Sequence, residues 1–196
     1  MITPTFDFEQ ELWKKGYKRI AGVDEVGRGA WAGPLVAAVV ILPDNYKLLN
    51  DLIKEGVRDS KLITAKKREK LAKIIKEAAV SFTIVESSVM VINKRGVGFA
   101  NKSALKRAAK NIGADWVLVD GLGGIVKGDQ KSVSIASASI IAKVYRDNLM
   151  SNLYNEKYPV YEFFRHKGYG TKLHQERIKE YGICRIHRVK FIHCNM

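Results

Sequence analysis

The chain has 196 residues, a length that suits one domain with at most a small appendage. Apolar residues make up 46% and charged residues 28%, which excludes wholesale disorder, and no apolar run approaches the roughly 20 residues of a membrane span. Lysine and arginine number 34 against 20 acidic residues, giving a formal net charge of +14. The positive electrostatic field of such a protein attracts polyanions, of which nucleic acid is the first candidate and anionic lipid the second. The alternative is a surplus of charge that serves only solubility.

Cysteine and histidine content argues against a disulfide framework and against a zinc finger. The two cysteines, Cys184 and Cys194, both lie near the end of the sequence, and no C-x-x-C pair occurs. Two thiols are typical of a reducing compartment, and the first residues lack the apolar core of a signal peptide. We therefore expect a cytoplasmic protein that does not bind membranes.

The first elements in chain order are predicted from short hydrophobic patterns. Residues 8–17 predict an amphipathic helix, and residues 19–23 predict a strand that leads into Asp24 and Glu25. The apolar run 35–42 is short and rich in valine, which predicts a strand covered on both faces.

The later patterns predict further strands and several basic helices. In order they are a helix at 64–79 capped by Thr64, a strand at 80–87, a helix at 101–111 closed by Gly113, a buried strand at 116–119, an extended piece at 125–127, a long helix at 132–158 and a final helix at 171–181. Strands and helices of this kind predict a mixed sheet flanked by helices.

Four acidic residues share a placement after short apolar stretches: Asp24, Glu25, Asp120 and Asp129. Carboxylates that converge at strand ends repel each other unless cations lie between them, and oxygen-only ligands favour Mg²⁺ or Mn²⁺. Two such ions can clamp a phosphodiester. The competing interpretation is that these acids form turns or cap helices. Asp24 and Glu25 would also point to opposite faces of a regular strand unless the strand ends or bulges there.

A glycine-containing loop follows the acidic pair. Gly27, Arg28 and Gly29 would let the backbone approach a ligand closely, and exposed N–H groups there could bind phosphate oxygens. A plain connecting loop is the alternative interpretation.

Two further segments could contact nucleic acid. The stretch at 58–61 could hold a phosphate through Lys61, although a helix cap with a solvated lysine is equally consistent with it. The loop at 166–171 carries Tyr169, which could stack on a sugar or a base, or could simply be half-buried.

Two other classes of protein stay open on these patterns alone. A nucleic-acid-binding module without catalysis would use the basic helices but would leave the four acids unexplained. A magnesium phosphatase for small substrates would use the acids but would not need the +14 charge. No Ser-His-Asp order, G-x-S-x-G motif or P-loop occurs.

Blocks spread over nearly the whole chain resemble ribonuclease HII, the type 2 ribonuclease H family. They are AGVDEVGRGAWAGPLVAAVVIL, RDSKLITAKKREKL, VLVDG, KGDQKS, ASIIAKVYRD, HKGYGTKLH and YGICRIHRVKF, in the family's order. The resemblance implies an α/β, ribonuclease H-like fold: a mixed β-sheet flanked by helices, with a small helical C-terminal part. It divides the chain into a catalytic domain at 1–158 and a helical, substrate-contacting segment at 159–196.

The same resemblance implies an activity. The expected enzyme is a metal-dependent endoribonuclease that hydrolyses the RNA strand of RNA–DNA hybrids and incises 5′ of ribonucleotides embedded in duplex DNA, leaving 3′-hydroxyl and 5′-phosphate ends. It would use Mg²⁺ or Mn²⁺, in a two-ion mechanism, and would act as a monomer on hybrids and on ribonucleotide-containing DNA.

The resemblance also implies roles for particular residues. The metal ligands would be Asp24, Glu25, Asp120 and Asp129; the contacts to the 2′-hydroxyl and neighbouring phosphate would be Gly27, Arg28 and Gly29; Tyr169 would stack on the next deoxyribose, and Lys61 would contact a phosphate. Asp147 is expected to be structural, because it lies inside the long helix.

The sequence departs from the family's pattern at two places. Ala30 and Trp31 stand where proline and leucine are more usual, which predicts a different loop rim. Only eight residues separate Asp120 from Asp129, fewer than in many members.

Overall fold

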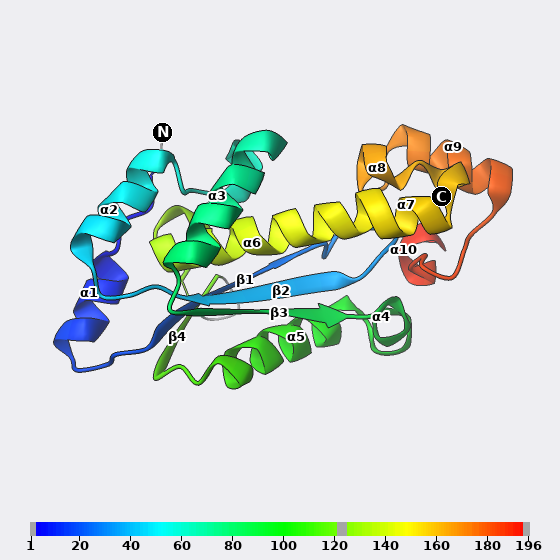
Figure 1. Cartoon of the computed structure of the whole chain (residues 1–196). Coiled ribbons are helices and arrows are strands. Elements are labelled where there is room, and N and C mark those ends of the chain that lie inside the picture. Colours follow the sequence, from blue (N-terminus) through cyan, green and yellow to red (C-terminus); the bar gives the residue numbers. More distant parts are fainter. Residues whose placement is uncertain (1–2, 121–124, 194–196) are drawn as a thin grey trace. The chain divides into compact units, whose positions relative to one another are not determined.

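The computed structural model describes residues 3–120 and 125–193, and its strands form one four-stranded sheet (Figure 1). The strands are β1 (Ile20–Val26), β2 (Leu35–Ile41), β3 (Ser81–Ser87) and β4 (Trp116–Val119). They are arranged in the order β3-β2-β1-β4, with β1 and β4 parallel and Ile20 opposite Trp116. This mixed sheet with its flanking helices confirms the predicted fold class.

The helices account for most of the remaining described chain. They are α1 (Asp7–Lys14), α2 (Tyr46–Glu55), α3 (Ala65–Ala78), α4 (Val89–Arg95), α5 (Val97–Ile112), α6 (Val133–Leu149), α7 (Asn155–Lys157), α8 (Phe163–His166), α9 (Lys172–Tyr181) and α10 (Val189–His193). Short 3₁₀ turns are η1 (Ser60–Leu62), η2 (Gly128–Gln130) and η4 (Pro159–Tyr161), and a π-helical segment, η3 (Met150–Tyr154), follows α6. None of the helices in the described ranges could cross a membrane.

The chain folds into two compact units that alternate along the sequence. The first comprises Met1–Val26, Ala37–Val85 and Leu105–Val144, and the second comprises Gly27–Val36, Glu86–Ala104 and Tyr145–Met196. The first unit holds most of the sheet. The second gathers the loop after β1 with α4 and the C-terminal helices. The division between residues 158 and 159 stays a prediction.

Several predicted elements are confirmed, and their physical causes are visible. Every residue of β2 is buried, as its valine-rich run predicts. The Thr64 hydroxyl accepts a hydrogen bond from the Lys67 N–H at the start of α3, which satisfies one of the free amides of the first turn. Gly182, at φ +74°, ends α9.

Other predictions are wrong where a local pattern does not determine an element's end. Strand β1 continues through Asp24 and Glu25 instead of stopping before them. Strand β4 is an edge strand in which only Leu118 is buried and Trp116 is 43% exposed. Helix α5 begins at Val97, four residues before the predicted start.

The segment before Asp129 also differs from its prediction. Ile125 makes a single bridge to Asp120, but residues 126 and 127 form a turn and Asp129 lies in η2. Lys127 adopts a left-handed conformation, with φ 55°, which reverses the chain and rules out an extended piece. The long C-terminal helix is present, but it passes from α6 through the π segment η3 into α7.

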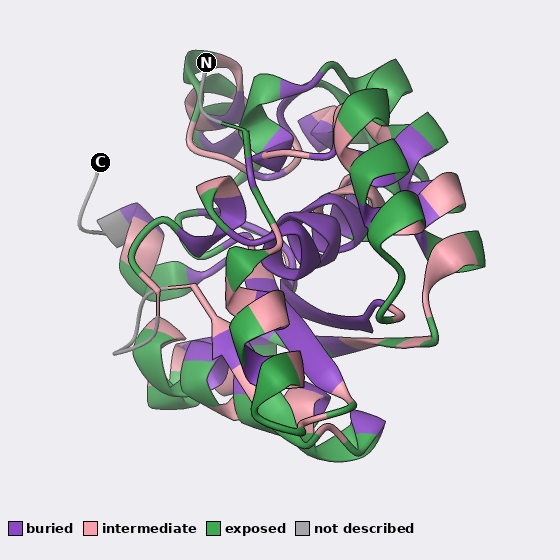
Figure 2. Ribbon diagram, turned by 90° about the vertical axis from the view of Figure 1, so that its left-hand side faces the viewer, coloured by how far each residue is buried: buried purple, intermediate pink, exposed green. Residues whose placement is uncertain are grey.

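Helix α6 approaches strand β1 very closely at Gly22. A Cβ atom on Gly22 would lie 2.1 Å from the carbonyl carbon of Ser134 and 2.4 Å from the nitrogen of Ile135. Only glycine allows such an approach of backbone to backbone. Figure 2 shows that the buried residues gather on this helix and on the sheet strands.

The first prediction is that Gly22→Ala destabilises the protein. The added methyl group would clash with the α6 backbone, which cannot move without repacking the core, so the loss should be about 1–3 kcal/mol. Gly98→Ala is the control, because a Cβ there meets nothing within 4 Å and Gly98 lies in α5. Urea unfolding measures both variants, and equal stability of Gly22→Ala and the wild type would contradict this close packing.

Candidate active site

Asp24 is a buried acid on β1, with 8% of its surface exposed. The Ser139 side chain, on α6, hydrogen-bonds to its carboxyl group, and the Ser139 Oγ lies 2.9 Å from the Ser60 Oγ. Burial, chiefly, raises the pKa of Asp24 to about 8, and the charges of Glu25 and Asp129 act in the same direction. Asp24 therefore lies among other acids in a region with little water.

Asp129 is the second buried acid, 5% exposed in η2. Burial raises its pKa to about 6, and the charges of Asp59 and Asp120 also raise it, whereas the Lys61 ammonium lowers it. Asp59 shares a side-chain hydrogen bond with Asp129. The segment at 58–61 thus contributes an acid as well as a base to the surroundings of Asp129.

Asp120 follows β4 and is held by the backbone of the turn that carries Asp129. The Gly128 N–H donates a hydrogen bond of 2.8 Å to the Asp120 Oδ1. A Cβ on Gly128 would lie 2.6 Å from the Ile135 side chain, so the turn packs directly against α6. One backbone amide therefore joins the segments of Asp120 and Asp129.

The four predicted acids all lie in the first unit and are electrostatically linked. Asp24 interacts with Glu25 and Asp129, and Asp129 interacts with Asp120. No three histidine, cysteine, aspartate or glutamate groups among the described residues are already arranged to hold a metal ion. Their role as ligands stays a prediction.

The donor set fits a hard divalent cation. All four predicted groups are carboxylates, the ligand type that Mg²⁺ and Mn²⁺ prefer. The raised pKa values of Asp24 and Asp129 arise from burial and mutual repulsion, and a bound cation would favour their ionised forms.

The predicted recognition residues Gly27, Arg28, Gly29 and Tyr169 lie in the second unit, whereas Lys61 lies in the first. The N–H groups of Trp31 and Ala32 donate to the Gly168 carbonyl at 2.8 and 3.0 Å, and Ala30 pairs with Tyr169 in an antiparallel bridge. These contacts place the loop that begins at Gly27 beside the loop that carries Tyr169. The Tyr169 side chain is half-buried, and the Arg146 guanidinium lies 5.3 Å from its ring centre.

Three buried histidines support the Tyr169 loop. The His174 Nδ1 lies 2.9 Å from the Tyr169 carbonyl oxygen, its Nε2 lies 3.1 Å from the His187 Nε2, and the His166 Nδ1 accepts a hydrogen bond from Gly168. Burial lowers the pKa of His174 to about 3 and that of His187 to about 4. Both rings are therefore neutral at pH 7 and act as fixed hydrogen-bonding groups.

The unusual pair Ala30 and Trp31 packs in the interior of the loop. Ala30 is fully buried and Trp31 is 7% exposed. A Cβ on Gly170 would lie 2.2 Å from the Trp31 ring, and the His174 ring lies 6.0 Å from it. A difference at the loop rim stays a prediction.

Some residues around these sites escaped the sequence analysis. They are Ser139 beside Asp24, Asp59 beside Asp129, and the buried Arg146 and Arg188 of the second unit. The alternation of alanine and serine in residues 136–139 signals a tightly packed helix face and could have pointed to Ser139. No local pattern distinguishes the two arginines from surface residues.

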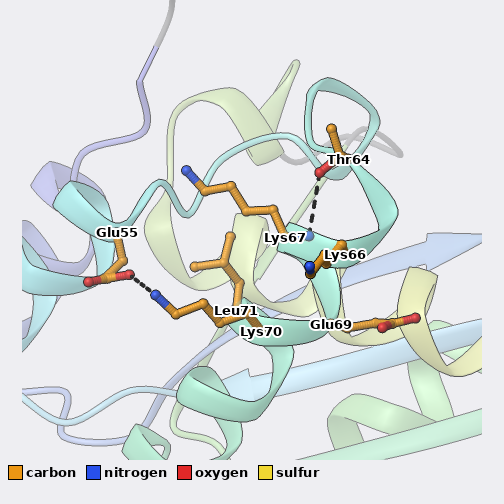
Figure 3. Close-up of a pocket in the computed structure, with 7 residues that line it drawn as sticks. All are labelled: Glu55, Thr64, Lys66, Lys67, Glu69, Lys70 and Leu71. Atoms are coloured by element: carbon orange, nitrogen blue, oxygen red, sulfur yellow. Dashed lines mark hydrogen bonds and ion pairs between the residues drawn. The ribbon is translucent and has the colours of Figure 1, made fainter.

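A basic hollow lies between α2 and α3 in the first unit (Figure 3). It has a volume of about 610 Å³ and is lined by Glu55, Thr64, Lys66, Lys67, Glu69, Lys70 and Leu71. Lys70 pairs with Glu55 at 3.0 Å, whereas Lys66 and Lys67 are exposed. The hollow is therefore lined by three lysines and two glutamates.

Comparison with known proteins gives the family. A model of ribonuclease HII matches residues 21–194. Ribonuclease HII of Acetivibrio thermocellus is 47% identical over 195 residues, covering 94% of this chain and 73% of that protein. The enzyme of Caldicellulosiruptor bescii is 45% identical over 198 residues, covering 95% and 93%.

Solved structures agree with the sequence relatives. Ribonuclease H2 of Pyrococcus horikoshii superposes with a TM-score of 0.74 at 28% identity, covering 88% of this chain and 93% of that one. Ribonuclease HII of Archaeoglobus fulgidus, in its complex with PCNA, gives 0.76 at 26% identity, covering 89% and 94%. The fold is that of a ribonuclease H, an endonuclease. Within that class, the chain belongs to the ribonuclease HII family.

The second prediction concerns the basic hollow. Reversing Lys66 and Lys67 to glutamate should flatten the salt dependence of duplex binding, because each neutralised phosphate contributes about −0.9 to the slope of log affinity against log salt. The same reversal at Lys106 and Lys110 is the control, since α5 covers the opposite face of the sheet from α3 (Figure 1). Equal slopes for both variants would show that α3 has no special contact with the duplex.

Proposed function

We propose that this ribonuclease H uses Mg²⁺ or Mn²⁺, held by Asp24, Glu25, Asp120 and Asp129, to cut the RNA strand of RNA–DNA hybrids and to incise 5′ of single ribonucleotides in duplex DNA. The observation that carries the proposal is that the buried Asp24 and Asp129 act on each other electrostatically, with Glu25 acting on Asp24 and Asp120 on Asp129. A protein that only bound nucleic acid would gain nothing from buried negative charge beside its phosphates.

The chain's own residues would orient the acids for this chemistry. Ser139 fixes Asp24 from α6, and the Gly128 N–H fixes Asp120. When bound, the metal ions would activate a water molecule and stabilise the departing oxygen. Breaking the bond between phosphorus and the 3′ oxygen leaves a 3′-hydroxyl on one fragment and a 5′-phosphate on the other.

Recognition of the ribonucleotide would fall to the second unit. The 2′-hydroxyl distinguishes RNA from DNA. Gly27, Arg28 and Gly29 offer backbone groups to it, and the two glycines have no side chain that would keep a sugar away. Tyr169, in the neighbouring loop, would stack on the next deoxyribose. Lys61, whose charge already acts on Asp129, would contact a phosphate near the acids. We propose a monomer acting on these duplexes.

The third prediction tests the metal ligands. Asp24→Asn and Asp120→Asn should each lower the cleavage rate by at least about 10²–10³-fold, because removing one strong electrostatic contributor costs that much. The fold and duplex binding should survive. Asp44→Asn, at an exposed acid, is the control and should cut normally. Near-normal turnover of either test variant would contradict the assignment of these acids as metal ligands.

The fourth prediction tests Tyr169. Tyr169→Ala should weaken cutting at a single embedded ribonucleotide far more than it weakens duplex binding. Tyr169→Phe keeps the ring and loses only a hydrogen bond worth about 0.5–1.5 kcal/mol, so it should keep part of the activity. Comparing kcat/KM on a single-ribonucleotide duplex and on a uniform hybrid measures both effects.

The control for Tyr169 is Tyr181→Ala, which removes a tyrosine that is 47% exposed in the same unit. Wild-type rates for Tyr169→Ala on both substrates would make Tyr169 an ordinary packed aromatic residue.

A further inference from the structure

Two arginines of the second unit are completely buried: Arg146 in α6 and Arg188 just before α10. All hydrogen bonds that the described part of the chain gives them go to main-chain carbonyl oxygens, and none goes to a carboxylate. Buried charges are normally paired with an opposite charge. This arrangement therefore calls for an explanation beyond ordinary packing.

Arg188 binds the loop that begins at Gly27. Its Nη1 donates to the Gly27 and Arg28 carbonyls at 2.6 and 3.0 Å. Its Nε and Nη2 donate to the Gly33 carbonyl at 3.0 and 2.8 Å. One guanidinium group thus joins the two ends of the loop from inside.

Arg146 binds the far end of the same loop and connects it to the Tyr169 loop. Its Nε and Nη2 donate to the carbonyls of Pro34 and Ala32 at 2.9 and 3.0 Å. Its Nη1 donates to the Lys167 carbonyl at 2.9 Å, and its guanidinium lies 5.3 Å from the Tyr169 ring centre. The two predicted recognition loops therefore share one internal anchor.

Arginine side chains stay protonated in proteins at neutral pH, so both guanidinium groups are charged. Burial lowers the pKa of Arg188 to about 9, and the charge of Arg146 acts in the same direction. Arg188 is still protonated at neutral pH. Carbonyl dipoles are the groups that balance its charge, so the loop carbonyls are drawn inward and held there.

The inward carbonyls determine where the loop N–H groups point. The described peptides are all trans, and a trans peptide directs its N–H opposite to its carbonyl. With the Gly27 and Arg28 carbonyls turned onto Arg188, the N–H groups of Arg28 and Gly29 point away from it. Both of these residues are exposed. Gly27, at φ +89°, has no room for a side chain, since a Cβ would lie 2.3 Å from the Arg146 Nε.

We propose that Arg146 and Arg188 are positioning residues, whose carbonyl contacts orient the backbone N–H groups of the loop toward the ribose 2′-hydroxyl and the adjacent phosphate. The inference rests on the proposed function, in which this loop reads the ribonucleotide. It adds that the two arginines hold the backbone of this loop from inside before substrate arrives.

The test compares Arg188→Lys and Arg146→Lys with Arg177→Lys. A lysine keeps the charge but cannot span the same carbonyls with a planar fork. Arg177 is the matched control, because its guanidinium bonds the carboxylates of Glu162 and Glu180 instead of the loop. The two test variants should lose about 10- to 100-fold in kcat/KM on a single-ribonucleotide duplex, as expected for misplaced binding groups. Their affinity for an all-DNA duplex, measured with chelator present, should stay near that of the wild type.

Gly29→Ala separates failure of this inference from failure of the proposed function. A Cβ on Gly29 meets nothing within 4 Å, so the fold should survive while the approach of the sugar is obstructed. Wild-type cutting by Gly29→Ala would overturn the reading role of the loop itself. Loss of cutting by Gly29→Ala with normal cutting by both test arginine variants would overturn only the positioning role.

A measurement on the wild-type protein covers the case in which the arginine variants do not fold. Nuclear magnetic resonance of the Arg146 and Arg188 Nε–H groups should show slow exchange with water. Both signals should shift when a single-ribonucleotide duplex is added in the presence of chelator, because a ligand bound to the loop N–H groups polarises the carbonyls that the arginines contact. Signals that respond equally to an all-DNA duplex would overturn the proposal.

Discussion

The contact of Gly22 with the backbone of α6 sets the geometry of the first unit. Two residues along a strand advance about 6.6 Å, and four residues along a helix advance about 6 Å and return to the same helix face. Asp24 lies two residues beyond Gly22, and Ser139 lies four residues beyond Ile135, whose nitrogen meets Gly22, so one close approach also brings the serine hydroxyl to the acid. The Ile135 side chain packs against Gly128 and so places the turn that carries Asp129.

The two units bury side chains of opposite charge. The first unit buries acids whose pKa values rise through desolvation and mutual repulsion, and the second buries two arginines held by carbonyls. Backbone dipoles serve both: the Gly128 amide binds Asp120, and the Gly27 carbonyl binds Arg188. The net charge of +14 provides the long-range attraction that brings a duplex to such a surface.

The sequence predicted the elements whose pattern is local. A short valine-rich run is typical of a covered strand, and a threonine ahead of a basic amphipathic stretch is typical of a helix cap, so β2 and α3 were predictable. The continuation of β1 through Asp24 and Glu25 was not, because pairing with neighbouring strands, and not hydrophobicity, determines where a strand ends. The turn before Asp129 depends on the left-handed conformation of Lys127, which no residue preference favours.

The sequence pointed to the acids and the loops of the candidate site, but not to the residues that hold them in place. Asp24, Asp120 and Asp129 stand out as few acids in a basic chain. Except for the Lys167 carbonyl, the partners of the buried arginines are loop carbonyls more than 110 residues away in the sequence, so no spacing rule could connect them.

The most direct test of the whole account is a cleavage assay with the wild-type protein on a DNA duplex that carries one ribonucleotide. The account predicts a single cut on the 5′ side of the ribonucleotide in Mg²⁺ or Mn²⁺, with a 3′-hydroxyl and a 5′-phosphate at the break, and no cut with chelator. Cleavage that persists in chelator, or equal cutting of an all-DNA duplex, would contradict it.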